Sequence, residues 1–320
     1  MGLLILILNY RTGKLTVDCL RSLADKLGEV PGARALIVDN GSGDGSAQQI
    51  ADEIAAQNWG EWATLLALTE NLGFAGGNNR GLETLKDQYK DAEYVLLLNS
   101  DTIVHHGALK YSHAVMQAEP GIGMMSCLLL NADGSVQNVT RKFPSPLRQT
   151  VCAFGLPWIF PKLFGWADVY DVPEAQLRIK RDCDWLGGAY MYIRRSALER
   201  TGPLDASFFF YGEDIEFCHR FHKRGFRVHY DPTVAITHIG GSSSDPTRVP
   251  TKQRSIYMWQ ARYMVQKKCY GSLAAWLVRG ADILAFGMRK TKMFLSGKRR
   301  TDTYKTVSDA LVLLLKPLRP

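Results

Sequence analysis

Polar side chains that could do chemistry begin where a run of apolar residues ends. Asn99, Ser100 and Asp101 directly follow the run at 94–98. Such a run predicts a strand buried on both faces of an α/β sheet, and open α/β sheets bind ligands at the carboxyl ends of their strands. A carboxylate at this position can hold a divalent cation under a phosphate. Capping of the following helix is the alternative role for Asp101.

Two glycine-rich segments follow other predicted strands. Asp39 comes after strand 35–38 and opens the turn at 40–46, where its carboxylate could accept a hydrogen bond from a nucleotide base. A plain turn with Asx bonding is the alternative. Segment 71–81 follows strand 64–68 but lacks the GxGxxG spacing, and no ribose-binding carboxylate follows about 20 residues on. This pattern disfavours a dehydrogenase and predicts a loop packed against a nucleotide or diphosphate.

A second pair of carboxylates, Glu213 and Asp214, stands between an aromatic run and the predicted helix 215–224. A carboxylate there either caps the helix or acts as a general base toward an acceptor hydroxyl. The helix dipole would lower the carboxyl pKa, whereas desolvation by the aromatic neighbours would raise it.

Two further positions carry functional and structural interpretations side by side. His238 ends a predicted strand, and it is either a metal ligand or a structural histidine. Trp185 precedes Gly187 and Gly188, which suggests tight backbone beside a stacked ring. Stacking of a sugar on Trp185 and burial of that ring in the core both explain this pattern.

The elements that must position these groups alternate between strands and helices. Predicted strands at 3–8, 35–38, 64–68 and 94–98, with helices between them, indicate a mainly parallel sheet with right-handed crossovers. Farther along, short strands are expected at 228–230 and 234–237. Residues 143–182 are rich in proline and aromatic residues, and a connection of this length is usually functional or mobile.

Composition narrows the class of protein. With 46% hydrophobic and 22% charged residues, the 320-residue chain can bury a core and is not disordered. Its six cysteines are scattered without a CxxC pair, which indicates a reducing compartment and argues against a zinc site or a disulfide framework.

Taken together, these segments resemble glycosyltransferase family 2, the inverting enzymes whose GT-A fold binds nucleotide sugars, over residues 3 to about 245. The resemblance rests on an ordered set of segments: Asn9–Arg11, Val38–Ser42, Asn71–Asn78, Leu98–Asp101, Trp185–Ala189, Gly212–Asp214 with Arg220, and His238. The Asn-Leu-Gly-Phe-Ala-Gly-Gly-Asn and Phe-Phe-Tyr-Gly-Glu-Asp forms look most like bacterial rhamnosyltransferases of surface-polysaccharide synthesis. The implied fold is a Rossmann-like nucleotide-diphospho-sugar transferase domain at 1–252, with a mixed, mainly parallel sheet and helices on both faces, followed by a basic helical extension at 253–320.

The resemblance implies a role for each candidate residue. Asp39 would bind the N3–H of uracil or thymine, and Asp214 would be the catalytic base. Asp101 and His238 would bind Mg²⁺ or Mn²⁺ on the diphosphate, although Asn99 replaces the first aspartate of the family's Asp-x-Asp motif and leaves fewer anionic ligands. The nucleotide pocket would be lined by Asn9, Tyr10, Arg11, Asn71, Gly76, Asn78, Asn99 and Ser100. The donor sugar or the acceptor would lie near Trp185, Gly187, Gly188 and Glu213.

The implied reaction is an inverting, metal-dependent hexosyl transfer. The expected donor is dTDP-L-rhamnose, and the expected acceptor is a saccharide or a polyprenyl-diphosphate-linked saccharide of bacterial cell-envelope polysaccharide synthesis. UDP-galactofuranose or another UDP-hexose is the alternative donor. A non-catalytic nucleotide-sugar-binding module is the alternative of a different class, and the intact carboxylates and His238 argue against it. A sugar nucleotidyltransferase is disfavoured because segment 9–14 carries only Gly13 in place of a glycine-rich signature.

Charge sets the C-terminal segment apart. The net charge is +8, and residues 250–320 contain 15 Lys and Arg against three Asp, so the remainder is mildly acidic. No apolar run of 18 residues is present, whereas aromatic residues among the basic ones fit an amphipathic helix on an anionic membrane surface. Packing on the catalytic domain or on a second subunit of a homodimer is the alternative.

Binding of nucleic acid by this segment is disfavoured because no matching motif is present. We expect a cytoplasmic enzyme that contacts the inner face of the plasma membrane.

Overall fold

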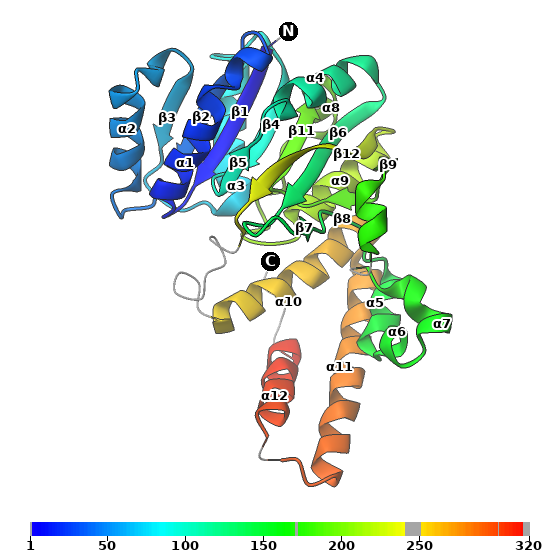
Figure 1. Ribbon diagram of the computed structural model, residues 1–320. Coiled ribbons are helices and arrows are strands. Elements are labelled where there is room, and N and C mark those ends of the chain that lie inside the picture. The colour runs from blue at the N-terminus through cyan, green and yellow to red at the C-terminus, as the bar shows by residue number, and fades with distance from the viewer. Residues whose placement is uncertain (1, 170–171, 241–250, 300, 316–320) are drawn as a thin grey trace. The chain divides into compact units, whose positions relative to one another are not determined.

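The computed structural model describes residues 2–169, 172–240, 251–299 and 301–315 and divides into two compact units (Figure 1). The first unit consists of Met1–Arg141 and Val172–Pro250, and the second of Lys142–Asp171 and Thr251–Pro320. The proline- and aromatic-rich insertion, which lies inside the predicted domain 1–252, thus groups with the C-terminal helices.

A sheet of ten strands forms the first unit, in the order β3-β2-β1-β4-β11-β6-β12-β5, with β7 added to β6 and β9 to β12. The strands are β1 (Gly2–Asn9), β2 (Arg34–Asp39), β3 (Ala63–Ala67), β4 (Ala92–Asn99), β5 (Thr102–Val104), β6 (Ile122–Leu130), β7 (Val136–Gln137), β9 (Arg181–Asp182), β11 (Tyr190–Arg194) and β12 (Arg227–His238), and a separate pair is formed by β8 (Thr140–Arg141) and β10 (Trp185–Leu186). Strands β1 to β4 are mutually parallel, as are β6 and β12, whereas β11 and β5 run antiparallel to their neighbours. The predicted mixed, mainly parallel α/β sheet is confirmed.

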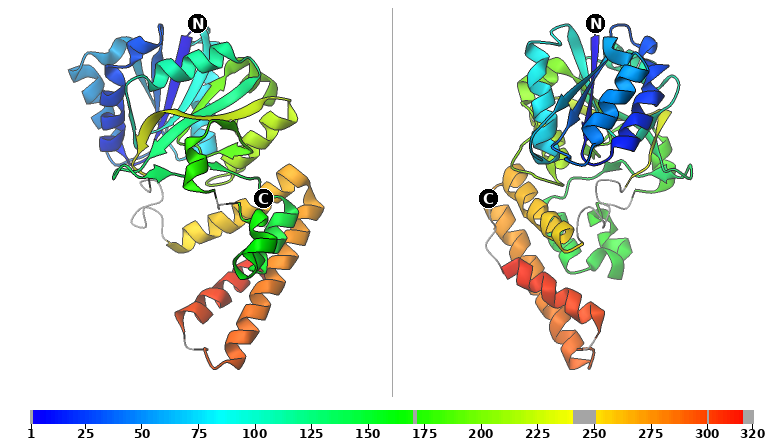
Figure 2. Two further views of the ribbon diagram at one scale, coloured as in Figure 1. Left: turned by 45° about the vertical axis from the view of Figure 1, so that its right-hand side comes forward. Right: turned by 90° about the vertical axis from the view of Figure 1, so that its left-hand side faces the viewer.

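Helices cover both faces of this sheet, which buries its central strands completely (Figures 1 and 2). One face carries α1 (Gly13–Ala24), α2 (Ser46–Ala56) and α4 (Ala108–Ala118), and the other carries α3 (Gly73–Glu83), α8 (Arg195–Thr201) and α9 (Glu213–Lys223). Short 3₁₀ helices lie at Leu27–Glu29, Trp59–Glu61, Thr84–Lys86, Gly165–Ala167 and Glu174–Arg178. Every side chain of β1 from Leu3 to Ile7 is at most 1% exposed, as expected for a strand with helices above and below.

Two local expectations are wrong. Segment 71–81 is not a loop, because α3 begins at Gly73. Its glycines allow close packing on the sheet: a Cβ at Gly77 would lie 2.5 Å from Leu8, and one at Gly81 would lie 2.4 Å from Leu6. The two short strands expected near residue 230 form the single strand β12, whose register against β6 shifts between Asp231 and Ala235.

Helix α3 is also tied to the segment that leads into α9. The Asn79 side chain donates to the Leu204 carbonyl (2.8 Å) and accepts from the Leu204 N–H (3.0 Å). The Phe74 N–H donates to the Phe209 carbonyl (3.1 Å). Gly73 has φ +73°, and a Cβ there would lie 2.5 Å from the Phe209 oxygen, so this contact requires glycine.

The second unit is helical, as predicted for the C-terminal residues. It contains α5 (Pro146–Ala153), α6 (Leu156–Ile159), α7 (Pro161–Phe164), α10 (Thr251–Tyr270), α11 (Ser272–Leu295) and α12 (Asp302–Leu315). Tyr263, Val278 and Leu314 form its small buried core. Beside them, the buried Asp282 accepts hydrogen bonds from the Arg262 guanidinium (2.9 and 3.0 Å) and the Tyr263 hydroxyl (2.8 Å). Within the described ranges, every helix is too short or too polar to span a bilayer.

Candidate active site

The site is built at the carboxyl ends of β1, β2 and β4, which lie at one edge of the parallel part of the sheet. The β1–β2 register places Asn9 opposite Asp39. The Asn9 Nδ2 donates to Asp39 Oδ1 (2.5 Å), and Ser42 donates to the same carboxylate from its hydroxyl (2.5 Å) and its N–H (3.2 Å). The Asn9 Oδ1 accepts from Thr12 and Thr16, which fixes the orientation of its amide. Asp39 is therefore held in place with lone pairs left for a ligand.

Other nucleotide-binding candidates directly follow β1 and β4. Arg11 donates from its N–H to the Ser42 hydroxyl (2.9 Å), and its guanidinium lies 5.2 Å from the centre of the Tyr10 ring. The Ser100 hydroxyl lies 3.0 Å from that of Thr12, which joins the end of β4 to the end of β1. Both side chains are buried, and the predicted contact of Ser100 with a nucleotide stays a prediction.

Asn40 connects this strand edge to α3, and the sequence did not mark it as a site residue. Its Nδ2 donates to the Asn71 side chain and to the Gly73 carbonyl, each at 3.0 Å, and its Oδ1 accepts from the Leu72 N–H (3.0 Å). The predicted contributor Asn71 is thus placed by Asn40. Two other predicted residues lie within α3: Gly76, where a Cβ would lie 2.8 Å from Leu72 Cβ, and Asn78, which donates to the Phe74 carbonyl (2.9 Å). Their contact with a nucleotide stays a prediction.

The two predicted metal ligands lie side by side. Strand β5 pairs antiparallel with the end of β12, and the register sets His238 opposite Thr102. This places His238 Nε2 3.3 Å from Asp101 Oδ1 and 3.2 Å from Asn99 Nδ2. The carboxylate oxygen and the imidazole nitrogen are ligands that suit Mg²⁺ or Mn²⁺, whereas the Asn99 Nδ2 faces the ring as a hydrogen-bond donor.

The chain offers few ligands of its own to a metal ion at this position. Among the described residues, no cluster of three or more His, Cys, Asp or Glu side chains is placed to hold a metal ion. A divalent cation here would be held by Asp101 and His238 and would take its remaining ligands from a diphosphate and from water. This is the usual arrangement for Mg²⁺ bound under phosphates, so the residues present fit the ion.

The second carboxylate pair occupies the first turn of α9. Burial and the charge of neighbouring Asp214 raise the pKa of Glu213 to about 8. Burial also raises the pKa of Asp214, to about 6, although its hydrogen bond from the Ile215 N–H and the nearby positive charge of Arg141 act in the opposite direction. Two adjacent carboxylates with such separated pKa values suit one ionised base and one neutral acid near pH 7.

The loop after β10 lies against both Arg141 and α3. Trp185 is 5% exposed, and the Arg141 guanidinium stacks on its ring at 5.3 Å. The Gly187 N–H donates to the Val139 carbonyl (2.9 Å), and a Cβ at Gly188 would lie 3.3 Å from the Phe74 ring. The contact of Trp185 and the two glycines with a sugar stays a prediction.

One short segment, residues 136–141, connects the two chemical centres. The Gln137 Oε1 lies 2.8 Å from Nδ1 of His238, one of the two predicted metal ligands. The positive charge of Arg141 acts to lower the pKa of Asp214. Neither residue stands out in the sequence, because each is a single polar residue in a two-residue strand with no motif around it. Only the long-range strand pairing brings them to the site.

This architecture is that of the GT-A fold: a mixed, mainly parallel α/β sheet with helices on both faces and polar groups at the carboxyl ends of its parallel strands. The chain belongs to glycosyltransferase family 2, since the family described as "Glycosyltransferase like family 2" matches residues 2–257. The family resemblance of the sequence motifs is thereby confirmed.

Known relatives resemble the chain in sequence, and a solved structure shares its fold. The chain is 28% identical to N-acetylglucosaminyl-diphospho-decaprenol L-rhamnosyltransferase of Mycobacterium tuberculosis over 235 residues, which cover 71% of this chain and 74% of that protein. It is also 28% identical to rhamnosyltransferase WbbL of Escherichia coli K12, over 52% of this chain and 60% of that protein. The solved structure of the Pyrobaculum calidifontis mannosyltransferase PcManGT with GDP-Man and Mn²⁺ shares the fold, with a TM-score of 0.53, 16% identity and coverage of 98% of this chain and 84% of that one.

Proposed function

We propose that this glycosyltransferase transfers L-rhamnose from dTDP-L-rhamnose, with inversion, to a saccharide or a polyprenyl-diphosphate-linked saccharide of the cell envelope. The observation that carries the proposal is the placement of Asp101 beside His238 at the same sheet edge that holds Asp39. Both rhamnosyltransferase relatives support rhamnose as the transferred sugar, and the diphospho-decaprenol acceptor named for the Mycobacterium tuberculosis relative supports a lipid-linked acceptor. UDP-galactofuranose and other UDP-hexoses are the alternative donors.

In this proposal each group of residues has one task. Asp39 accepts a hydrogen bond from the N3–H of the pyrimidine base. Asp214 takes the proton of the acceptor hydroxyl as that oxygen attacks the anomeric carbon from the face opposite the nucleotide. Glu213, neutral at pH 7, lies beside the base without adding a second negative charge. A bound Mg²⁺ or Mn²⁺, held by Asp101 and His238, would supply Lewis-acid stabilisation of the leaving diphosphate.

The raised pKa of Asp214 supports its role as the base. A catalytic base works best when its pKa lies near the operating pH, because it is then both ionised and reasonably basic. Loss of a general base typically lowers a rate ~10²–10⁴-fold. We therefore expect Asp214→Asn to lower kcat by at least 10²-fold at pH 7.5 without abolishing nucleotide binding.

Nucleotide release from a panel of dTDP- and UDP-sugars, with Mn²⁺, Mg²⁺ or EDTA, tests this function. Release of dTDP from dTDP-L-rhamnose alone, lost with EDTA and in Asp214→Asn, would support the proposal. Full turnover in EDTA would overturn the roles of Asp101 and His238. Release of UDP from a UDP-hexose in place of dTDP would transfer the proposal to the alternative donor. If nothing is released, calorimetric titration with dTDP and UDP separates a required acceptor from a wrong ligand class.

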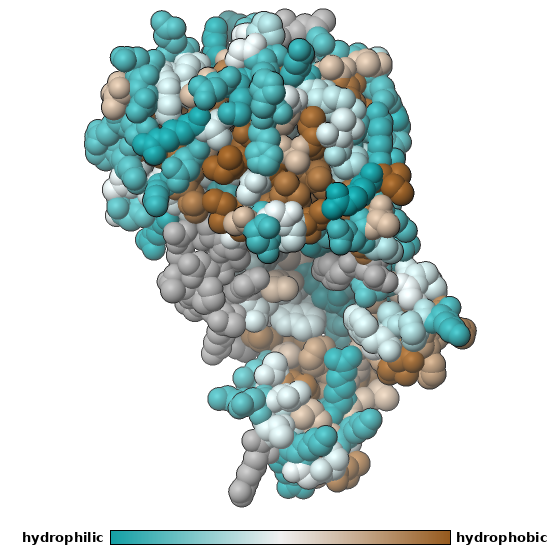
Figure 3. Space-filling model, viewed as in Figure 1, coloured by the Kyte–Doolittle hydropathy of each residue, from teal (hydrophilic) through white to brown (hydrophobic). Residues whose placement is uncertain are grey.

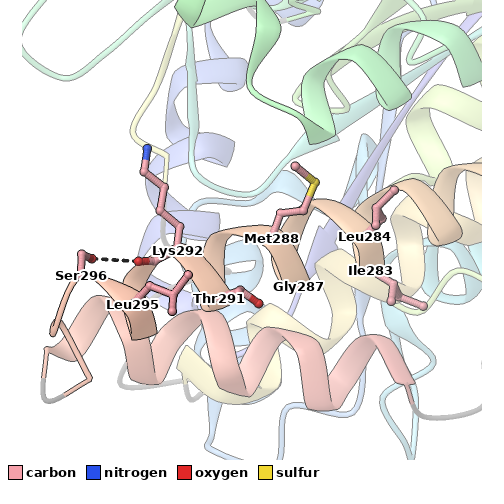
Figure 4. A pocket seen from close by; sticks show the side chains of 8 residues that line it. All are labelled: Ile283, Leu284, Gly287, Met288, Thr291, Lys292, Leu295 and Ser296. Atoms are coloured by element: carbon pink, nitrogen blue, oxygen red, sulfur yellow. Dashed lines mark hydrogen bonds between the residues drawn. The ribbon is translucent and has the colours of Figure 1, made fainter.

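The helical unit supports a second part of the proposal, a peripheral contact with an anionic membrane on the cytoplasmic side. Its amphipathic surface consists of exposed apolar residues on α6, α7 and α11: Trp158, Ile159, Phe160, Leu163, Trp276, Leu284, Met288 and Leu295. Figure 3 shows apolar atoms over the α5–α7 region, and Figure 4 shows Leu284, Met288 and Leu295 lining a hollow along α11 beside Lys292. Exposed lysines among apolar side chains suit lipid headgroups that carry negative charge. A homodimer contact of this unit stays the alternative.

Vesicle sedimentation of the full-length protein tests the membrane contact. We expect binding to vesicles containing phosphatidylglycerol but not to pure phosphatidylcholine, and at least tenfold weaker binding after Trp158→Ser with Leu163→Ser. Ile179→Ser is a matched control, because Ile179 is a comparably exposed apolar residue on the other unit. Equal binding of all variants, or dimerisation without vesicle binding, would refute the membrane contact.

A further inference from the structure

The side chain of Gln137, which lies outside the family motifs, contacts the His238 ring at Nδ1, the nitrogen that does not face Asp101. Gln137 lies at the end of β7, and its Oε1 is 2.8 Å from His238 Nδ1. The same carboxamide reaches the main chain of the histidine, since its Nε2 lies 2.7 Å from the His238 carbonyl oxygen. Gln137 therefore holds both the ring and the backbone of a proposed metal ligand.

The hydrogen bonds of Gln137 determine which way its amide points. Its Nε2 donates to two acceptors, the His238 carbonyl and the Asn131 Oδ1 (2.6 Å). A backbone carbonyl can only accept, so the nitrogen of the amide must face it. The oxygen must then face His238 Nδ1, which leaves Nδ1 as the donor of that hydrogen bond.

This orientation fixes the chemistry of the opposite ring nitrogen. A neutral imidazole with a proton on Nδ1 carries a lone pair on Nε2. Nε2 is the atom that lies 3.3 Å from Asp101 Oδ1 and 3.2 Å from Asn99 Nδ2. The lone pair thus points toward the carboxylate, as a shared cation would require.

We infer that Gln137 is a positioning residue that sets the tautomer and orientation of His238 for metal binding. The hairpin between β6 and β7 supports Gln137 in turn, because Gln137 pairs opposite Leu129. Its partner Asn131 donates to Ser135 twice, from its side-chain amide to the hydroxyl (2.8 Å) and from its N–H to the carbonyl (2.8 Å). Residues that bond the second nitrogen of a metal-binding histidine commonly change metal affinity 10–100-fold when they are removed. The metal part of this inference rests on the proposed function, whereas the tautomer part does not.

The tautomer is read directly from ring-nitrogen NMR of full-length protein labelled with ¹⁵N-histidine, with the His238 signals assigned from His238→Ala. We expect wild type to carry the proton on Nδ1 at pH 8. Gln137→Met removes the acceptor and should move the proton toward Nε2. Gln137→Glu keeps an oxygen facing Nδ1 and should keep the proton there, even though its second oxygen opposes the His238 carbonyl and lowers stability.

Asn131→Ala separates positioning from support of the hairpin, because it removes one partner of Gln137 and leaves the bond to His238. If Gln137 only stabilises the hairpin, the tautomer will follow thermal stability across the three variants. If Gln137 positions His238, the tautomer will follow the presence of an oxygen at residue 137. A wild-type His238 protonated on Nε2, or an unchanged tautomer in Gln137→Met, would overturn the inference.

Titration of the same proteins with Mn²⁺ alone, followed by the electron paramagnetic resonance signal of the free ion, tests the metal part. We expect Gln137→Met to weaken Mn²⁺ binding about 10–100-fold and Gln137→Glu to retain it within a few-fold. Equal Mn²⁺ affinity of wild type and His238→Ala would refute the proposed metal role of His238, and the NMR result would still decide the role of Gln137. Loss of affinity in His238→Ala but not in Gln137→Met would refute only the present inference.

Discussion

Glu213 should make the folded protein lose stability as the pH rises. Its pKa is raised to about 8 by burial and by the charge of Asp214, whereas an unfolded glutamate titrates near 4.3. Between these two pH values the folded chain holds a proton that the unfolded chain has released. The free energy of unfolding must therefore fall with increasing pH in this window, because the folded state binds more protons.

The size of the effect follows from the difference between the two pKa values. Each pH unit in the window lowers the free energy of unfolding by about 1.4 kcal/mol, so the loss from pH 4.5 to 8 is at most on the order of 4 kcal/mol. Glu213→Gln keeps the shape of the neutral acid and cannot ionise. We expect it to be more stable than wild type by no more than about 1 kcal/mol at pH 5 and by roughly 2–4 kcal/mol at pH 8.5.

Urea unfolding followed by circular dichroism from pH 5 to 8.5 measures this difference. Glu83→Gln is the control, since the Glu83 side chain is exposed and pairs with Arg80 on the surface, so its effect should not change with pH. Parallel curves for wild type and Glu213→Gln across the whole range would refute the reasoning. They would mean that Glu213 is ionised in the folded protein at an ordinary pKa.

Three further predictions concern other parts of the molecule. Gly73→Ala should cost roughly 1–3 kcal/mol of stability in thermal unfolding, because Ala is strained at φ +73° and its Cβ would meet the Phe209 carbonyl; an unchanged melting temperature would contradict this contact. Asp282→Asn should cost about 3 kcal/mol of urea stability, because it leaves the Arg262 charge unpaired beside a buried amide; a loss below 1 kcal/mol would show that the pair contributes little. The rate of transfer should fall about tenfold per pH unit below about pH 6, because Asp214 must be ionised to act as a base; a rate that stays level down to pH 4.5 would exclude the raised pKa.

The parts of the fold that are local in sequence could be predicted. The apolar run at 94–98 is strand β4, and Asp101 follows it at the strand end. The glycines of segment 71–81 predict a loop because a glycine-rich segment after a strand resembles a dinucleotide-binding loop. Their role depends on Leu6 and Leu8 of β1, which no local pattern reveals.

The candidate site shows the same limit. Asp101 and His238 could be named from their motifs, but their contact depends on the antiparallel pairing of β5 with β12. Gln137 and Arg141 can be identified only from strand pairing, β7 with β6 and β8 with β10, because an isolated polar residue in a short strand has no distinguishing spacing. The pKa values of Glu213 and Asp214 depended on whether burial or the helix dipole dominates, and burial raises both.

The hydrogen bonds between Asn79 and Leu204 have a consequence for comparing variants of this enzyme. They join the helix that carries the glycine segment to the chain that leads into Asp214, so a displacement of either segment breaks hydrogen bonds that the other one also uses. Substitutions in either segment should therefore combine non-additively in double-mutant cycles. A variant of α3 that slows transfer can consequently act through the base, and natural replacements in the two segments should be accepted together more readily than singly.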